Sequence, residues 1–277
     1  MKRAIVTIAA GKRFEQEFKK WMFPEWKVYA KKFGFDIIVI DRFLDTSERA
    51  IKRSPAWQKC ILHRDPAICK YDQIAWVDAD IRINPTAPSI FDFSPIDKIS
   101  AIDAWATPTK EDHDLVLSRN YAKWDAEGVE YIKNPTAQEY HKTYGLDSKH
   151  DQVVNTGVMV YTPEMSKDIF EKTYNNYEEK GGPHWNYEMR PVSYEILQSG
   201  LAHWLTPRFN MLWLWLIELH YPFLKTSGLH GKMLKHFPLL NTIGPRRDCV
   251  LAAFTNSYFL HFAGQSLDYR LIPLQST

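Results

Sequence analysis

The first part of this chain alternates between short apolar runs and longer amphipathic stretches, and this alternation limits the folds open to it. The apolar runs are rich in residues that favour strands, and they cover residues 4–9, 36–41, 74–80 and 99–104. Segments with helical spacing of apolar side chains separate them, so the pattern predicts βαβ units. We therefore expect an α/β fold with a mostly parallel central sheet flanked by helices. In such sheets ligands bind beyond the carboxyl ends of the strands.

Local signals place helices between these runs. Residues 13–33 carry aromatic side chains at helical spacing, and Pro24 begins a second helical piece. Ser54 followed by Pro55 is typical of an N-cap and a first helical position. We expect one helix from there toward Tyr71.

The second half of the chain is less regular. We expect loops and short helices over residues 107–152, and a strand over 153–161 that Asn155-Thr156-Gly157 interrupts. The remaining elements that we expect are helices over 163–179 and 191–198 and strands near 202–205 and 258–262. There is no repeat and no low-complexity linker, which favours one domain.

Size and composition exclude some classes of protein. With 277 residues, the chain is long enough for one large α/β domain. Its net charge of +2 argues against a dedicated nucleic-acid binder, which carries a strong basic stripe. Three cysteines without metal or redox spacing favour a reducing compartment, so we expect a cytoplasmic location. The apolar run after Met1 is too short for a signal peptide, and we expect no targeting segment.

The apolar run 211–224 is too short to span a bilayer and contains Glu218 and His220. A buried helix is the main prediction for it. The alternative is an interfacial segment that makes peripheral membrane contact, because cationic residues follow it. These residues are Lys225, Lys232, Lys235, Arg246 and Arg247.

The third apolar run ends in Asp78-Ala79-Asp80, two carboxylates in alternate positions. Side chains two apart on a strand point to the same side, so the pair is expected to converge where the strand surfaces. Two carboxylates at such a short distance repel each other unless a cation lies between them. Oxygen ligands suit Mg²⁺ or Mn²⁺. Such a cation can hold the diphosphate of a nucleotide sugar. The motif by itself also fits a strand followed by an acidic turn.

A second motif lies late in the chain, where His261 sits in an apolar run that ends at Gly264. Together with the aspartate pair and the strand order, it resembles the retaining GT-A glycosyltransferases. Family 8, which includes glycogenin and lipopolysaccharide galactosyltransferases, looks nearest, and the resemblance extends to about Arg270. It implies that Asp78, Asp80 and His261 hold a metal ion. Two carboxylates and an imidazole suit Mn²⁺ better than Mg²⁺.

The resemblance also implies which parts of the chain bind the donor and the acceptor. It implies one GT-A domain over 1–277, with a nucleotide-sugar-binding half over 1–105. The acceptor-binding half and the C-terminal metal-ligand segment then cover 106–277.

Three polar residues are assigned to the sugar side of the site by the same resemblance. Asp103 follows the strand after the metal motif, Asn155 matches a segment whose amide contacts sugars, and Glu188 precedes a helix start beside the donor sugar. Asn155 fits a bulge or turn equally well. Glu188 also fits a plain N-terminal helix charge.

A further group is assigned to the nucleotide and its phosphates: Thr7, Ala9, Lys59, Asp78 and Gly264. Lys59 lies where the family keeps a cation near the donor, although a solvated helix lysine is nearly as good an interpretation. A glycine at 264 would let the backbone approach a phosphate closely.

One departure from the family concerns the leaving diphosphate. The lysine that the family often has after this glycine is absent, since Gln265, Ser266 and Leu267 follow Gly264. The residues that could supply the charge instead are Lys12, Arg13 and Arg270.

The resemblance implies a hexosyltransferase-like enzyme that moves a sugar from a UDP-sugar to an acceptor hydroxyl, with retention. The acceptor would be a carbohydrate, glycolipid or glycan. One alternative is a sugar nucleotidyltransferase, because residues 9–13 resemble its phosphate loop, although the Gly-Thr that completes the loop is absent. The other alternative is a non-catalytic protein of the same fold that binds nucleotide sugars or carbohydrate.

Overall fold

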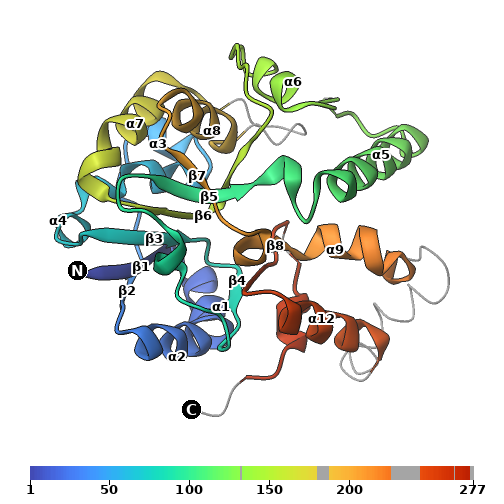
Figure 1. Cartoon of the computed structure of the whole chain (residues 1–277), viewed down its shortest axis with the longest axis horizontal. Helices are drawn as coiled ribbons and strands as arrows, with labels where there is room; N and C mark the ends of the chain where they lie inside the picture. Colours follow the sequence, from blue (N-terminus) through green and yellow to red (C-terminus); the bar gives the residue numbers. More distant parts are fainter. Residues whose placement is uncertain (132, 180–186, 226–243, 265, 275–277) are drawn as a thin grey trace.

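The computed structural model describes the chain except for residues 132, 180–186, 226–243, 265 and 275–277. Within the described residues, six strands form a central sheet in the order β2-β1-β3-β6-β5-β7 (Figure 1). Strand β6 is antiparallel to both its neighbours, and the other pairings are parallel. The α/β class is therefore confirmed, with one strand reversed in an otherwise parallel sheet. The strands are β1 (Arg3–Ile8), β2 (Asp36–Ile40), β3 (Gln73–Val77), β5 (Ile99–Asp103), β6 (Val154–Tyr161) and β7 (Ala202–Trp204).

Helices cover both faces of this sheet, which explains why its inner strands are apolar without alternation. On β1, Ile5 joins one core cluster, whereas Ala4 and Val6 join the cluster on the opposite face. Figure 1 shows α1 and α2 on one side and α7 and α8 on the other. These helices are α1 (Lys12–Trp21), α2 (Phe23–Phe33), α7 (Pro163–Asn176) and α8 (Met189–Gln198).

A second, three-stranded sheet brings distant parts of the chain together. Its strands are β4 (Ile81–Ile83), β9 (Phe259–His261) and β8 (Met211–Leu212). Strand β4 pairs with β9 in antiparallel register, with Ile81 opposite His261, and β8 pairs with β9 in parallel. The small sheet therefore places the end of the chain beside the segment that follows β3.

The predicted helix over 54–71 is broken in two. Ser54 caps the 3₁₀ helix η1 (Pro55–Arg64) through a bond from the Ala56 amide, as its sequence predicts. Asp65 then caps a separate helix, α4 (Pro66–Cys69). The first helix ends at Asp65 because a residue before a proline disfavours helical geometry. Pro66 then begins the second helix.

The expectation of loops and short helices over 107–152 is wrong for its first half, because the helix α5 covers Lys110–Glu127. It is confirmed for the described residues of 128–152, where the only helix is the short α6 (Ala137–Lys142). Thr109 caps α5 by accepting a bond from the Asp112 amide, and Gly128 ends it in the left-handed conformation. Its buried residues do not form a regular apolar stripe, which is why periodicity did not reveal it.

Two predictions about strands are wrong in part. The strand β6 is continuous through Asn155-Thr156-Gly157, and all its residues are buried. Its pairing with β5 shifts register between Val154 and Met159, so the irregularity predicted at Asn155 is present in the ladder. The strand predicted over 74–80 ends at Val77, and Asp78 to Asp80 form a turn in which the Ile81 amide bonds the Asp78 carbonyl. The two aspartates converge through this turn and not through the alternation of a strand.

The apolar segment 211–224 forms β8, the helix α9 (Trp213–His220) and the start of η6 (Pro222–Lys225). The core side of α9 is buried, whereas Leu214 and Phe223 are exposed. Lys225 pairs with Glu218. Lys232 and Lys235 lie outside the described residues. None of the helices that the structure describes is long and apolar enough to cross a membrane.

The remaining long helix is α12 (Pro245–Asn256). The other elements are short: α3 (Glu48–Ile51), η2 (Ile90–Phe93), η3 (Ala104–Ala106), α6 (Ala137–Lys142), η5 (Pro207–Asn210) and η7 (Asp268–Leu271).

A buried ion pair ties the N-terminal helices to the small sheet. Arg82 on β4 is fully buried and binds the carboxylate of Glu25 on α2. The same guanidinium donates to the carbonyl of Tyr269 at 2.7 Å, so it also fixes the C-terminal segment. Burial raises the pKa of Glu25 even though Arg82 opposes this shift.

We predict that Arg82→Ala destabilises the fold by about 3–5 kcal/mol, because it leaves a buried carboxylate without its partner. Urea unfolding measures the loss. The exposed variant Lys52→Ala, which removes the surface pair with Glu48, is the control and should change stability by less than about 1 kcal/mol. Equal effects of the two substitutions would contradict the anchoring role of Arg82.

Candidate metal and sugar-nucleotide site

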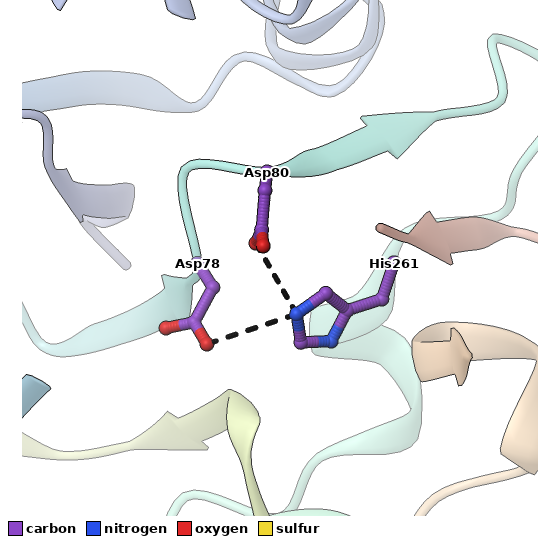
Figure 2. A group of neighbouring side chains, drawn as sticks. All are labelled: Asp78, Asp80 and His261. Carbon is purple, nitrogen blue, oxygen red and sulfur yellow. Dashed lines mark ion pairs between the residues drawn. The ribbon is translucent and has the colours of Figure 1, made fainter. Parts of the chain in front are cut away.

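Asp78, Asp80 and His261 converge beyond the end of β3. One potential ligand atom from each residue lies within 4.8 Å of the other two. The imidazole Nε2 is 3.2 Å from Oδ1 of Asp80 and 4.0 Å from Oδ2 of Asp78. Figure 2 shows both carboxylates directed at the same edge of the ring. Two carboxylate oxygens and one imidazole nitrogen suit Mn²⁺, so the donor set fits the metal that the sequence predicts.

Backbone pairing holds the three side chains in place. The Phe262 amide donates to the Asp80 carbonyl, which extends the β4–β9 ladder past His261. The Asp78 amide donates to the Gly157 carbonyl on β6 at 2.9 Å. The turn that carries both aspartates is therefore fixed to both sheets.

A chain of amides orients the imidazole of His261. Its Nδ1 lies 2.9 Å from Oδ1 of Asn210, and Nδ2 of Asn210 donates to Oδ1 of Asn155 at 2.9 Å. Oδ1 of Asn155 also accepts from the Gly157 amide. Since Asn210 offers an acceptor to Nδ1, the ring carries its proton there, and Nε2 presents its lone pair to a metal.

Gly157 lets this ring lie against β6. A Cβ at this position would stand 2.7 Å from Cε1 and 2.9 Å from Nδ1 of His261, and 3.1 Å from Nδ2 of Asn210. Carbon atoms do not approach this closely, so a side chain here would displace the imidazole. The glycine is required by close packing and not by its backbone angles.

The two oxygens of Asp78 have different partners. Oδ1 accepts bonds from Nζ of Lys59 at 3.0 Å and from Nε1 of Trp76 at 2.8 Å. Oδ2 faces His261. The carboxylate is thus held by one oxygen and presents the other to the metal position.

Lys59 is buried between two carboxylates, with 3% of its side chain exposed. Its ammonium lies 3.0 Å from Asp78 Oδ1, 3.0 Å from Glu188 Oε1 and 3.2 Å from the Thr156 carbonyl. Three acceptors use all three N–H donors of an ammonium group. The alternative of a solvated lysine is wrong. The diphosphate contact predicted for Lys59 has no donor left in this arrangement.

Charge balance in the site follows from these contacts. Burial disfavours the charged form of Lys59, but Asp78 and Glu188 outweigh it and raise the pKa of the lysine. Burial likewise opposes protonation of His261, but Asp80 raises the pKa of the imidazole. A metal and a proton therefore compete for Nε2, since the metal binds only the neutral ring.

Glu188 stands at the N-cap position of α8 but makes no capping bond. Its Oε1 accepts from Oγ1 of Thr156 at 2.9 Å and from Lys59. The carboxylate therefore points into the site, as its predicted sugar-side role requires, and the interpretation as a plain helix charge does not describe it.

The carboxylate of Asp103 bonds two backbone amides at the end of β5. Its Oδ1 accepts from the amides of Trp105 and Val153 at 2.9 and 3.0 Å. Burial raises the pKa of this carboxyl group. Its catalytic role stays a prediction.

Three further residues assigned to the nucleotide are Thr7, Ala9 and Gly264. Thr7 is fully buried on β1, and its hydroxyl lacks a partner among the described residues. Ala9 is buried and its amide bonds the Ile40 carbonyl. Gly264 adopts a positive φ of 75°, which favours glycine. Their nucleotide contacts stay predictions.

The residues that could replace the family's lysine differ in whether their charge is already paired. Arg270 forms an ion pair with Glu17, with its Nη2 2.9 Å from Oε2 of the carboxylate. Lys12 and Arg13 are exposed at the start of α1, beyond the carboxyl end of β1. The last two stay predictions for the diphosphate contact.

A cavity of about 270 Å³ is lined by Asn155 and by residues of the helices that follow β5. Aromatic residues from η3, α5, α6 and α9 line it together with Asn155. Because Asn155 also bonds Asn210, two hydrogen bonds connect this cavity to His261.

The sequence did not single out Asn210 or Trp76, and it gave Gly157 no role of its own. A lone amide in the apolar run 209–217 and a glycine inside a strand were the available signals. A glycine in a strand interior often marks the close approach of another group.

Neither a protein-family model nor a curated protein sequence matches the chain. Solved structures do resemble it. A glycosyltransferase involved in glycosylation of the major capsid of PBCV-1 is 13% identical, with a TM-score of 0.51, over 98% of this chain and 98% of that one. The apo structure of the bifunctional glycosyltransferase WbbM is 12% identical, with a TM-score of 0.54. That match covers 96% of this chain and 46% of WbbM.

An active-site mutant of LgtC is 13% identical over 95% of this chain and 88% of its own, with a TM-score of 0.47. The matches to the capsid enzyme and to WbbM, at these low identities, establish the fold. The chain has the α/β fold of GT-A glycosyltransferases.

We predict that Gly157→Ala weakens Mn²⁺ binding at least about tenfold, because the added methyl group displaces the oriented imidazole. Titration followed by electron paramagnetic resonance measures the affinity. Gly200→Ala is the control: its φ of 69° makes alanine strained, but nothing lies within 4 Å of the new Cβ. Unchanged Mn²⁺ affinity in Gly157→Ala would contradict the packing of His261 on β6.

We predict that Lys59→Met lowers the free energy of unfolding by about 3–5 kcal/mol, because it leaves two buried carboxylates unbalanced. Denaturant unfolding of this variant and of the surface control Lys52→Met gives the comparison. If Lys59→Met were as stable as the control and lost only donor affinity, Lys59 would be a ligand contact after all.

Proposed function

We propose that this chain is a metal-dependent glycosyltransferase that moves a sugar from a nucleoside diphosphate sugar to an acceptor hydroxyl. The observation that carries the proposal is the convergence of Asp78, Asp80 and His261 beyond β3, in a chain with the glycosyltransferase fold. Ligands of open α/β sheets bind at this edge.

Asp78, Asp80 and His261 would hold the metal, and Asn210 would orient the imidazole. A bound divalent cation supplies Lewis-acid stabilisation of the negative charge that develops on the leaving diphosphate.

The protein's own groups would act on the sugar side. Lys59 keeps Asp78 and Glu188 at fixed positions and balances their charge. Glu188 would stabilise the positive charge that the sugar develops as its anomeric bond breaks. Asp103 at the end of β5 and Asn155 near the start of β6 would also act on the sugar.

The finer assignments rest on resemblance. We propose UDP as the nucleotide, Mn²⁺ as the metal, a hexose as the transferred sugar and retention as the outcome. The division into a nucleotide-sugar half (1–105) and an acceptor half (106–277) belongs here too, although β6 and β7 of the second half lie within the central sheet.

A cytoplasmic location and peripheral membrane contact through 211–224 are proposals of the same kind. Exposed Leu214 and Phe223 support the membrane contact. Flotation with anionic liposomes tests it, and absence of binding would exclude it.

Product analysis separates the rival functions. A glycosyltransferase releases nucleoside diphosphate from a donor sugar, whereas a nucleotidyltransferase releases pyrophosphate from a nucleoside triphosphate and a sugar phosphate. A protein that binds donor sugars and hydrolyses none across a panel would be a non-catalytic binder.

We predict that Asp80→Ala and His261→Ala each lower Mn²⁺-dependent release of nucleoside diphosphate by at least about a hundredfold, because a metal ligand is lost. Both should keep a cooperative unfolding transition. His63→Ala is the matched control, because this histidine pairs with Glu171 outside the site. Near-normal turnover in either ligand variant would exclude the proposed metal site.

A further inference from the structure

The cavity that Asn155 lines also contains an arginine that has no counterion among the described residues. Arg190, on the first turn of α8, lines the cavity and is 4% exposed. Its guanidinium lies over the Tyr140 ring, 4.4 Å from the centroid. Its Nε and Nη1 have no acceptor among the described residues. Buried donors without partners are costly and rare in folded proteins.

A second unsatisfied donor lines the same cavity. The indole Nε1 of Trp105 is buried and lacks an acceptor within the described part of the chain. Arg190 and Trp105 thus offer only N–H groups. The cavity is prepared for a ligand that brings acceptors, and the guanidinium favours one that carries negative charge.

Other buried arginines of the described chain show what Arg190 lacks. Arg82 binds the carboxylate of Glu25, and Arg53 binds that of Glu178. Arg53 also lies over aromatic rings, so stacking on a ring does not replace the carboxylate there. Burial lowers the pKa of Arg190, and only tyrosines oppose this shift.

The wall of the cavity suits a sugar. Rings of Tyr121, Trp124 and Trp215 line it, and aromatic faces pack well on the C–H faces of pyranoses. The side chains of Asn120 and Asn155 add polar groups. At about 270 Å³ the cavity is slightly smaller than the roughly 300–1,000 Å³ of typical small-molecule sites, which suits one monosaccharide unit.

We propose that this cavity is the acceptor subsite and that it binds a sugar bearing an anionic group, a carboxylate or a phosphate ester. Arg190 and Trp105 bind the anionic group, and the aromatic wall holds the ring. Asn155 links this subsite to the metal ligand His261 through Asn210. The inference rests on the proposed glycosyltransferase function, which it extends by naming the acceptor class.

Binding of simple sugars tests the proposal without any turnover. The probes are methyl glucoside, methyl glucuronide and glucose 6-phosphate, titrated against the full chain by ligand-observed NMR. At least one anionic probe should bind about tenfold or more tightly than the neutral one, because charge-assisted bonds add to the ring contacts. A preference for the glucuronide identifies a carboxylate, and a preference for the phosphate identifies a phosphate ester. Equal affinity for all three probes would overturn the proposal.

Arg190→Gln should reduce the anionic preference to about one. The matched control is Arg64→Gln, since Arg64 also lies over a tyrosine ring but has Glu171 as its partner. The control should keep the preference. Retention of the preference in a folded Arg190→Gln would overturn the role of Arg190. If that variant does not fold, the wild-type probe comparison still decides the proposal.

Three further outcomes separate this inference from the proposed function. Displacement of the anionic sugar by UDP without metal would place the donor's diphosphate in the cavity and contradict the acceptor assignment. Anionic preference in a protein that hydrolyses no nucleotide sugar would contradict the proposed function but leave the anion site standing. Hydrolysis without anionic preference would contradict only the inference.

Discussion

The pairing of β4 with β9 is the constraint on which the site depends. It sets His261 opposite Ile81, the residue directly after the aspartate turn. The two segments are far apart in the chain, so this strand pairing is what brings the imidazole close to the two carboxylates. The same small sheet carries Asn210 immediately before β8, so one set of backbone bonds places both a ligand and the group that orients it. Regular strand pairing thus fixes the geometry before any metal binds.

A buried charge network joins the Asp78, Asp80 and His261 cluster to Glu188, the residue proposed to act on the sugar. Lys59 bridges Asp78 and Glu188. The carbonyl of Thr156 accepts a bond from Lys59, and its hydroxyl donates one to Glu188. Such a network is costly to bury and is stabilising only when every member has a partner. Arg190 is the contrast, since its donors are unsatisfied in the described chain. Lys59, with all its donors bonded, holds Asp78 and Glu188, whereas Arg190, with donors unsatisfied among the described residues, lines a cavity.

The parts of this fold that the sequence predicts are those that local patterns control. Strands β1 and β3 are buried on both faces, so their continuous apolar runs identified them. Helix α5 lacked a regular stripe, and the aspartate turn followed a strand that ended earlier than alternation suggested. The importance of Gly157 and Asn210 arises from contacts with β9, a segment distant in sequence. Burial of Lys59 likewise requires Glu188 to arrive from another element, which no local pattern records.

The most direct test of the central claim is to locate the metal. Crystals grown with Mn²⁺ and UDP, measured at the manganese absorption edge, would show the ion through its anomalous scattering. The account predicts a peak bonded to Oδ2 of Asp78, Oδ1 of Asp80 and Nε2 of His261, with the diphosphate beside it. A peak elsewhere, or bound UDP with no metal among these three side chains, would contradict it.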